Sequence, residues 1–323
     1  MEQQNIDKQA MLFGYIMGDG WLSIIGNHKY IGASGDAYDL ELIKQDLVEL
    51  YGDIGKATIF TDETESPKYG IKGVTNKCSF NVKIAEIFKN LDMPIGKRVE
   101  QETHIPNWVL YGSNDTKISF LSGYYSADGT RPNVQRNNKT QRCLELVFYK
   151  RKTLEKNGDE LVNEFGKILN DLGLTYTYTK IEVMTKELSV KYNILLDNNL
   201  ENSIKALSLF DFRYCQRKKR DAINLLYYLL YKQSFIDRYN KVKEHCEYNK
   251  IHNIKESNKS IAQKYGVTER KVTKIKTGAN KCFNAKSIMS FDDFQVMLSA
   301  LNPVKQGKLS DMYNLVSDLS CVK

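Results

Sequence analysis

Two short stretches of the sequence end an apolar run on the same pair of residues, an aspartate followed by a glycine. The first is LFGYIMGDG, from Leu12 to Gly20, and the second is LSGYYSADG, from Leu121 to Gly129. One such pair usually marks no more than the end of a helix. Two copies favour a functional interpretation, because paired carboxylates can hold divalent ions beside a phosphodiester.

Small residues spaced four apart indicate how the two stretches meet. Gly14 with Gly18, and Gly123 with Ala127, each lie on one face of a helix. Without bulky side chains on that face, two helices can approach backbone to backbone. We expect the two stretches to pack together, and the glycine after each aspartate to leave its helix in a left-handed conformation.

This packing would carry Asp19 and Asp128 to the same end of a two-helix seam. Two carboxylates there repel each other, and both face the negative ends of helix dipoles. A bound cation relieves both effects. Mg²⁺ suits such a site, because it keeps water and binds through one or two carboxylates together with phosphate oxygens. We expect Mg²⁺ as the cofactor, with Mn²⁺ as a substitute.

The elements around the two stretches repeat in the same order, which indicates two halves of mixed helix and strand. In the first half, periodicity predicts strands at 29–36, 56–63 and 77–83 and helices at 37–52 and 85–93. In the second half, it predicts strands at 143–150, 175–185 and 188–196 and helices at 154–174 and 199–210. The polar segment 96–115, which contains Pro106, indicates a connector between the halves.

The chain has 323 residues, and its excess of positive charge lies near the C-terminal end. Between Lys232 and Lys281 there are 13 Lys or Arg and 5 Asp or Glu, an excess that equals the net charge of +8 of the whole chain. Such a concentration is a footprint for nucleic acid. Length predicts two or three domains. Together with the two repeated halves, the change to a lysine-rich and mostly helical pattern beyond about Tyr231 predicts three, residues 1–112, 113–232 and 233–323.

Six cysteines are scattered without a C-x-x-C pair, so neither a disulfide framework nor a zinc ribbon is indicated. His245, Cys246, His252 and Cys282 match no zinc spacing either. The sequence has no apolar leader and no apolar run that could cross a bilayer. We expect a soluble intracellular protein without a membrane partner, in a bacterial or phage-infected cytoplasm or in an organelle.

The two stretches resemble the paired motifs of single-chain LAGLIDADG homing endonucleases, and each shares five of the nine family letters. The earlier acidic position of the motif is Met17 or Ser126 here, whereas the later one, which the family uses to bind metal, is aspartate in both. The resemblance covers about residues 11–231. It implies that Asp19 and Asp128 hold metal with the backbone carbonyls of Gly18 and Ala127.

The same resemblance implies an α+β fold of two pseudo-symmetric αββαββα halves. Their antiparallel, saddle-shaped sheets would lie in the major groove of DNA, with side chains on one strand face contacting bases and phosphates. A small all-α module would follow. We expect a monomer bound to double-stranded DNA with a long specific target. The side chains expected at the DNA are Lys29, Tyr30, Arg131, Asn133, Arg136 and Lys139.

The resemblance also implies one basic residue beside each scissile phosphate, where its charge stabilises the transition state and orients water. Lys218 is the candidate in the second half, because it lies in FDFRYCQRKKR, which resembles a phrase of intein-type members; Lys219 stands beside it. Lys97 is the candidate in the first half, within a connector-like GKRVEQETHIPNWVL. Some members carry that lysine just before Ile-Pro, where this chain has Thr103 and His104.

The stretch KSIAQKYGVTERKVTKIKTG, residues 259–278, has the spacing of a helix-turn-helix. Ala262, Gly266, Val272 and Ile275 occupy its core and turn positions, and Thr268 can cap the second helix. The outward face of that helix would offer DNA the side chains Arg270, Lys271, Thr273, Lys274 and Lys276. The other interpretation is an ordinary helical hairpin with a solvated basic face.

These patterns predict a site-specific, Mg²⁺-dependent homing endonuclease that cuts both strands of DNA. We expect it to be freestanding or intron-encoded, as part of a mobile genetic element. A DNA-binding transcription regulator on a non-cutting scaffold is one rival hypothesis, although decay should have erased at least one of the two aspartates, Asp19 and Asp128. An RNA intron maturase on the same scaffold is another.

Overall fold

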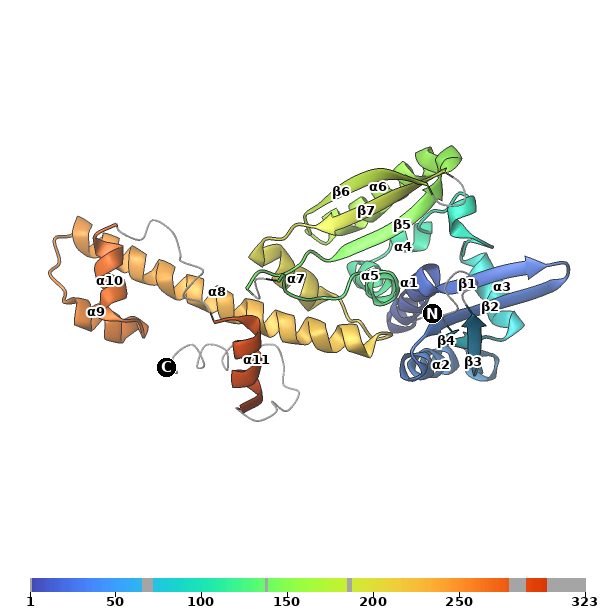
Figure 1. Cartoon of the computed structure of the whole chain (residues 1–323), viewed down its shortest axis with the longest axis horizontal. Helices are drawn as coiled ribbons and strands as arrows, with labels where there is room; N and C mark the ends of the chain where they lie inside the picture. The colour runs from blue at the N-terminus through green and yellow to red at the C-terminus, as the bar shows by residue number, and fades with distance from the viewer. Residues whose placement is uncertain (1, 66–71, 137–138, 185–187, 279–288, 301–323) are drawn as a thin grey trace. The chain divides into compact units, whose positions relative to one another are not determined.

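The computed structural model of the protein describes residues 2–65, 72–136, 139–184, 188–278 and 289–300. The chain forms two compact units (Figure 1). Unit 1 contains residues 1–132 and 143–222, and unit 2 contains residues 133–142 and the chain from 223 onward. Both motif stretches, 12–20 and 121–129, therefore lie within unit 1, whereas residues 133–142 and 223–232 of the predicted second half belong to unit 2. Among the described residues, no helix combines the length and the apolar character that a bilayer crossing needs.

The first half consists of four strands and the helices that flank them. Along the chain these are α1 (Gln3–Asp19), β1 (Gly20–Ile25), β2 (His28–Gly35), α2 (Ala37–Tyr51), a 3-10 turn (Gly52–Gly55), β3 (Thr58–Glu65), β4 (Lys72–Ser79) and α3 (Val82–Asn90). All neighbouring strands are antiparallel, in the order β1-β2-β4-β3. Sequence periodicity missed β1, whose short turn to β2 contains Gly26 at a positive φ of 58°.

The second half follows after a connector with a short 3-10 helix, Arg98–Glu100. Its elements are α4 (Asn107–Leu110), α5 (Asn114–Ala127), β5 (Glu145–Arg151), a 3-10 turn (Lys152–Leu154), α6 (Glu155–Asp171), β6 (Tyr176–Met184), β7 (Leu188–Leu196) and α7 (Leu200–Leu209). The strands form an antiparallel sheet in the order β5-β7-β6. The described part of the segment before β5 makes only isolated bridges, Gly129 with Leu146 and Val134 with Gln141.

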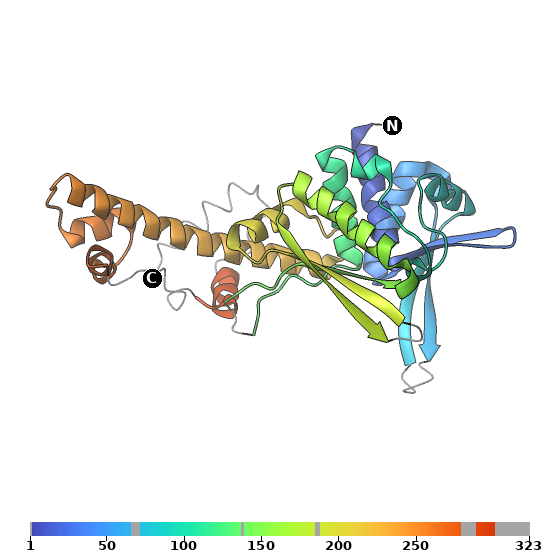
Figure 2. The same cartoon turned by 90° about the horizontal axis from the view of Figure 1, so that it is seen from above.

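Two antiparallel sheets with flanking helices confirm the predicted α+β fold. The second half departs from the αββαββα order at one place, because its first strand is replaced by that bridged segment. Figure 2 shows the helices of unit 1, among them blue α1 and green α6, on one side and strands of both sheets extending on the other. Within the described part of unit 1, helices therefore cover one side of each sheet and leave the other side open.

Aromatic side chains hold the centre of unit 1 together around α1 and α5. Phe13 on α1 is fully buried, and its ring stacks on Phe88 of α3 with a centroid distance of 6.1 Å. Trp108 meets the same ring edge-on at 5.6 Å, and Phe120 of α5 lies 6.4 Å away. This packing fixes the two helices that carry the aspartates.

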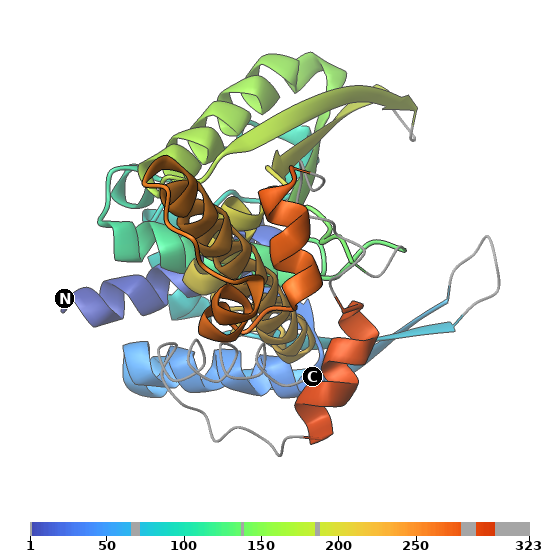
Figure 3. The same ribbon diagram turned by 90° about the vertical axis from the view of Figure 1, so that its left-hand side faces the viewer.

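Unit 2 is mostly helical and contains the longer part of α8 (Gln216–Ile251), together with α9 (Asn258–Tyr265), α10 (Glu269–Lys276) and α11 (Phe291–Ala300). The end of α8 lies beside α9 and α10 (Figure 3), and a buried cluster of side chains joins the three helices. Its members are Val242, Cys246, Ile261, Ala262 and Val272. Gly266, which the sequence placed at the turn, ends α9 in the left-handed region at a φ of 61°. Thr268 precedes α10, but its side chain makes no capping hydrogen bond.

Candidate functional site

The two motif helices, α1 and α5, approach each other through their glycines, as the spacing predicted. A Cβ atom added to Gly14 would lie 2.1 Å from the carbonyl oxygen of Phe120. One added to Gly123 would lie 1.9 Å from the carbonyl oxygen of Met11. Both distances are too short for any side chain, so only glycine allows this contact. Further along the seam, a Cβ on Gly18 would meet that of Ala127 at 2.3 Å.

The glycines that follow the two aspartates do not adopt the predicted left-handed conformation. Gly20 has a φ of −103° and continues directly into β1, and Gly129 is not among the described residues with positive φ. Glycine is needed there for space instead. A Cβ on Gly20 would lie 2.6 Å from the Ile16 side chain, and one on Gly129 would lie 2.5 Å from the Tyr125 ring.

Asp19 and Asp128 stand at the carboxyl ends of α1 and α5, where the helices meet. Both residues are exposed, so solvent or a ligand can reach them. Surrounding protein still weakens their hydration and raises the pKa of each carboxyl group. For Asp128, repulsion from Asp19 adds to this desolvation, and together they raise the pKa to about 6. The predicted convergence of two carboxylates is therefore present in the structure.

The end of α1 is capped by Arg98, from the 3-10 helix of the connector. Its Nη1 donates hydrogen bonds to the carbonyl oxygens of Ile16 at 2.9 Å and Gly20 at 3.4 Å. Its Nη2 donates a short hydrogen bond to the carbonyl oxygen of Gly18. A helix end leaves its last carbonyl groups without partners in the helix, although the carbonyl of Ile16 also accepts the backbone N–H of Gly20. A cation there also compensates the helix dipole.

The end of α5 is capped by Lys218, from the first turn of α8. Its Nζ donates hydrogen bonds to three consecutive carbonyl oxygens, those of Tyr125 at 3.0 Å, Ser126 at 2.9 Å and Ala127 at 2.7 Å. Burial lowers the pKa of Lys218. The adjacent Lys219 forms an ion pair with Asp211 at 2.8 Å. Of the two neighbouring lysines, Lys218 is the one at the helix end.

The two cations and the two carboxylates form one electrostatic group. Lys218 lowers the pKa of Asp19 more than Arg98 does, whereas Arg98 lowers the pKa of Asp128 more than Lys218 does. Each aspartate is thus most strongly affected by the cation that caps the other helix. The site is shared between the two halves of unit 1.

A cavity of about 410 Å³ opens beside Asp128. Its lining includes Arg98, Tyr124 and Lys150, and it also includes the sequence-predicted Lys97. Lys97 is 76% exposed and lies 3.3 Å from Glu100, with which it forms an ion pair. Lys97 therefore borders the site, while its neighbour Arg98 contacts the helix end directly.

Sequence reasoning missed two basic residues of this site, Arg98 and Lys150. Arg98 stands next to Lys97 in the connector, but the family resemblance implies a lysine at this place, and Arg98 is an arginine. Lys150 is only 1% exposed, and it shares the inward face of β5 with Leu146 and Phe148. Because side chains alternate between the two faces of a strand, the sequence places Lys150 on the buried face. A lysine among buried apolar residues was the signal in the sequence that could have identified it.

The donors at the seam fit a hard divalent cation. The described part of the chain contains no group of three or more His, Cys, Asp or Glu placed to hold a metal ion. Two carboxylates and helix-end carbonyls are the oxygen ligands that Mg²⁺ accepts while keeping water. The carbonyls of Gly18 and Ala127 already accept hydrogen bonds from the two cations, but each carbonyl oxygen has a second lone pair.

The side chains expected at DNA from the strands differ in their surroundings. Arg131 forms an ion pair with Asp221, and Lys29 pairs with Glu86. Tyr30 is 48% exposed. The other three candidates, Asn133, Arg136 and Lys139, belong to residues 133–142, which are part of unit 2. Asn133 bonds the amide of Val134, Arg136 is exposed, and the carbonyl of Lys139 accepts a hydrogen bond from Lys232.

The predicted basic face of α10 is only partly free. Arg270, Thr273, Lys274 and Lys276 are exposed. Lys271 is half-buried, with its Nζ 4.2 Å from the centre of the Phe235 ring, and burial lowers the pKa of its ammonium group. Lys276 donates a hydrogen bond to a backbone carbonyl at 3.0 Å. Lys271 therefore contributes to packing within unit 2 rather than to an open surface.

No known family's sequence profile matches the chain. It is 26% identical over 294 residues to the tRNA-splicing ligase RtcB of Pyrococcus furiosus. This alignment covers 89% of this chain and 28% of the ligase. It is 25% identical over 235 residues to the RNA polymerase subunit Rpo1N of Methanocaldococcus jannaschii, and this alignment covers 70% of this chain and 17% of the subunit. The chain spans less than a third of the length of these relatives.

Solved structures with a similar fold include two homing endonucleases. A mesophilic variant of I-DmoI has a TM-score of 0.41 at 17% identity and covers 64% of this chain and 90% of its own. I-WcaI bound to its DNA recognition sequence has a TM-score of 0.45 at 14% identity and covers 67% of this chain and 86% of its own.

Proposed function

We propose that the protein is a site-specific endonuclease of the LAGLIDADG kind, which hydrolyses both strands of a DNA target with Mg²⁺. The observation that carries this proposal is the seam, where two motif helices meet through glycines and end on Asp19 and Asp128. A fold needs no pair of exposed, mutually repelling carboxylates, whereas metal-assisted phosphodiester hydrolysis does. Natural proteins keep such unfavourable arrangements mainly where function requires them.

The proposed roles follow from chemistry and position. Asp19 and Asp128 would hold divalent metal together with the carbonyls of Gly18 and Ala127, and Mg²⁺ there would polarise the scissile phosphate and supply activated water. Arg98 and Lys218 keep two positive charges at the helix ends, where they stabilise the charge that develops on the phosphate in the transition state. Lys97 borders the same cavity and is a further candidate for phosphate contact.

DNA binding would come from two surfaces. The open side of the two sheets in unit 1 offers alternating side chains that suit groove readout. In unit 2, α9 and α10 have the spacing of a helix-turn-helix, with Arg270, Thr273 and Lys274 exposed on the second helix. The basic surplus of this region would add affinity that falls with salt. We propose that a monomer binds a long target in this way.

The relatives support the interpretation of this chain as a module that occurs within otherwise different proteins. A ligase and a polymerase subunit have different activities, yet each matches this chain over a minor part of its own length. A segment shared by such different proteins cannot carry the activity of both. We propose that the shared segment is a mobile endonuclease module, and that the named activities of these proteins belong to their other parts.

The test is selection of a target from a randomised duplex library with the full chain, followed by cleavage of a plasmid that carries the target. We expect linear product with Mg²⁺ or Mn²⁺ and none with EDTA, and loss of double-strand cleavage in Asp19→Asn and in Asp128→Asn. Asp53→Asn is a matched control, because Asp53 is exposed and forms an ion pair with nearby Lys56. Tight binding without cleavage would favour the regulator, and preferential binding of structured RNA would favour the maturase.

A further inference from the structure

Lys150, on β5 of the second half, holds the segment that carries Arg98. Its buried Nζ donates hydrogen bonds to the carbonyl oxygens of Arg98 at 2.9 Å and Gln101 at 2.7 Å, and to the hydroxyl of Thr103. All three acceptors lie in the connector that follows the first half. An ammonium group with three donors is matched by three acceptors here, so the connector is fixed at the point where Arg98 turns toward α1.

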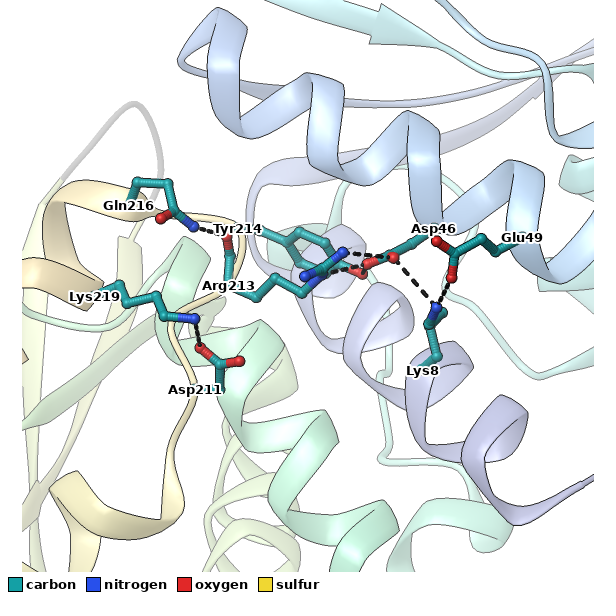
Figure 4. A network of polar contacts seen from close by, with 8 residues as sticks. All are labelled: Lys8, Asp46, Glu49, Asp211, Arg213, Tyr214, Gln216 and Lys219. Carbon is teal, nitrogen blue, oxygen red and sulfur yellow. Dashed lines mark hydrogen bonds and ion pairs between the residues drawn. The ribbon is translucent and has the colours of Figure 1, made fainter. Parts of the chain in front are cut away.

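Asp39 and Asp46, on α2 of the first half, hold the segment that carries Lys218. Asp46 is fully buried and accepts two hydrogen bonds from Arg213, at 2.7 and 2.9 Å, and one from the Tyr214 hydroxyl at 2.7 Å (Figure 4). Lys8 lies 3.5 Å from the same carboxylate. The segment entering α8 is therefore anchored to the opposite half immediately before Lys218.

Asp39 completes this anchor at the first residue of α8. Its Oδ1 accepts a hydrogen bond from the backbone amide of Gln216 at 2.9 Å. The first amides of a helix lack partners within the helix, and a side-chain oxygen usually caps them from the preceding residue. Here the cap comes from another helix, and Lys218 lies in the turn that it fixes.

The two arrangements are reciprocal although their chemistry differs. A lysine from the second half holds the cation that follows the first half, and aspartates from the first half hold the cation that follows the second. We propose that Lys150 and the pair Asp39 and Asp46 are positioning residues, each of which holds the basic residue of one active site from the opposite half of the chain. This inference rests on the proposed endonuclease function, and it places the support of each site in the opposite half of the chain.

The test uses strand-resolved cleavage by the full chain, on the duplex that the wild-type protein selects, labelled on either strand. A displacement of about 1 Å at a catalytic group can cost on the order of 100-fold in rate. We expect Lys150→Met and Asp39→Ala each to slow cleavage of one strand by about 10-fold or more, and the slowed strands to be opposite ones. Asp39→Asn keeps an oxygen that can cap Gln216 and should restore the balance between the strands.

Matched controls separate positioning from general stability. Lys117→Met and Asp171→Asn break an ion pair of 2.8 Å within the second half. Lys117 is also buried, and the pair joins α5 to α6 rather than to the segments that carry the cations. These variants should slow both strands alike. Equal slowing of both strands by Lys150→Met and Asp39→Ala would overturn the proposal.

Hydrogen exchange of the free protein gives a result that does not depend on cleavage. Asp39→Ala and Asp46→Asn should speed amide exchange in residues 213–220, and Lys150→Met should do so in residues 97–103, with the other segment unchanged. If the wild-type protein never cuts DNA but these exchange patterns appear, the endonuclease proposal fails while the bracing stands. Unchanged exchange in both segments would refute the bracing itself.

Discussion

The carboxyl ends of α1 and α5 meet the same requirement with different residues. At each end an aspartate follows a small residue, and a cation donates hydrogen bonds to the last carbonyls of the helix. The forked guanidinium of Arg98 reaches carbonyls on both sides of Asp19, those of Gly18 and Gly20. The single ammonium of Lys218 reaches three consecutive carbonyls that all precede Asp128.

This difference shows which part of the pseudo-symmetry is under constraint. The helix-to-helix contact is nearly identical from both sides, because a Cβ atom added to Gly14 or to Gly123 would lie 2.1 or 1.9 Å from a backbone carbonyl oxygen of the other helix. The cations instead come from unlike elements, a 3-10 helix in a connector and the first turn of a long helix. Positive charge at the helix end is common to both halves, whereas the residue that supplies it is not.

The largest expected effect is loss of the seam itself. Gly123→Val would place side-chain atoms within 1.9 Å of the Met11 carbonyl, so the helices must separate. We expect a destabilisation of about 3 kcal/mol or more, at the upper end of overpacking costs. Gly14→Val should cost nearly as much. Urea unfolding followed by circular dichroism measures both.

A substitution on the same helix but outside the closest contact serves as control. Ser119→Ala on α5 is half-buried and should change stability by less than about 0.5 kcal/mol. If Gly123→Val were destabilising and Gly14→Val harmless, the seam would not be symmetric. The two helix ends could then no longer be compared as equivalent positions of a symmetric pair.

The contrast between seam and cations also explains what the sequence could predict. Small residues at a spacing of four encode a helix contact locally, so Gly14, Gly18, Gly123 and Ala127 were placed correctly from the sequence. Strand periodicity located most of both sheets but missed β1, because GWLSII is an apolar run with little alternation. The capping cations depend on tertiary contacts between segments about 80 or more residues apart, which no local pattern encodes.

Replacing Arg98 by lysine and Lys218 by arginine tests whether positive charge alone is enough at each helix end. The expected effect on stability is intermediate. Arg98→Lys keeps the charge but loses the fork, so one nitrogen must replace hydrogen bonds to three carbonyls. We expect a loss of about 1.5 kcal/mol in stability, the scale of a hydrogen bond to a charged group. Lys218→Arg must fit a larger group among three converging carbonyls and should cost about 1 kcal/mol.

Thermal unfolding together with cleavage rates on the selected target would report both exchanges. Each should slow cleavage more than the charge-conserving change Lys219→Arg, because Lys219 pairs with Asp211 away from the helix ends. If both exchanges had no effect, the cations would be interchangeable charges. The difference between the two helix ends would then have no functional meaning.

The smallest expected effect concerns the two aspartates in the free protein without metal. The pKa of Asp128 is raised from 3.8 to about 6, so the folded state binds a proton more readily than the unfolded state. Stability therefore falls as pH rises between about 4 and 6, and the penalty is complete above that window. Asp128→Asn removes the penalty and should stabilise the free protein at pH 7 but not below pH 4.

Because Asp128 is exposed, solvent screening should keep this gain below about 1 kcal/mol. Asp19→Asn should give a gain with the same sign, since the pKa of Asp19 is also raised by desolvation. Melting temperatures measured with EDTA from pH 4 to pH 8 test both variants, and added Mg²⁺ should then raise the melting temperature of the wild type more than that of Asp128→Asn. Equal stability of the wild type and Asp128→Asn at every pH would mean that neither desolvation nor repulsion from Asp19 destabilises the carboxylate of Asp128, and the main reason for placing metal between the two helix ends would disappear.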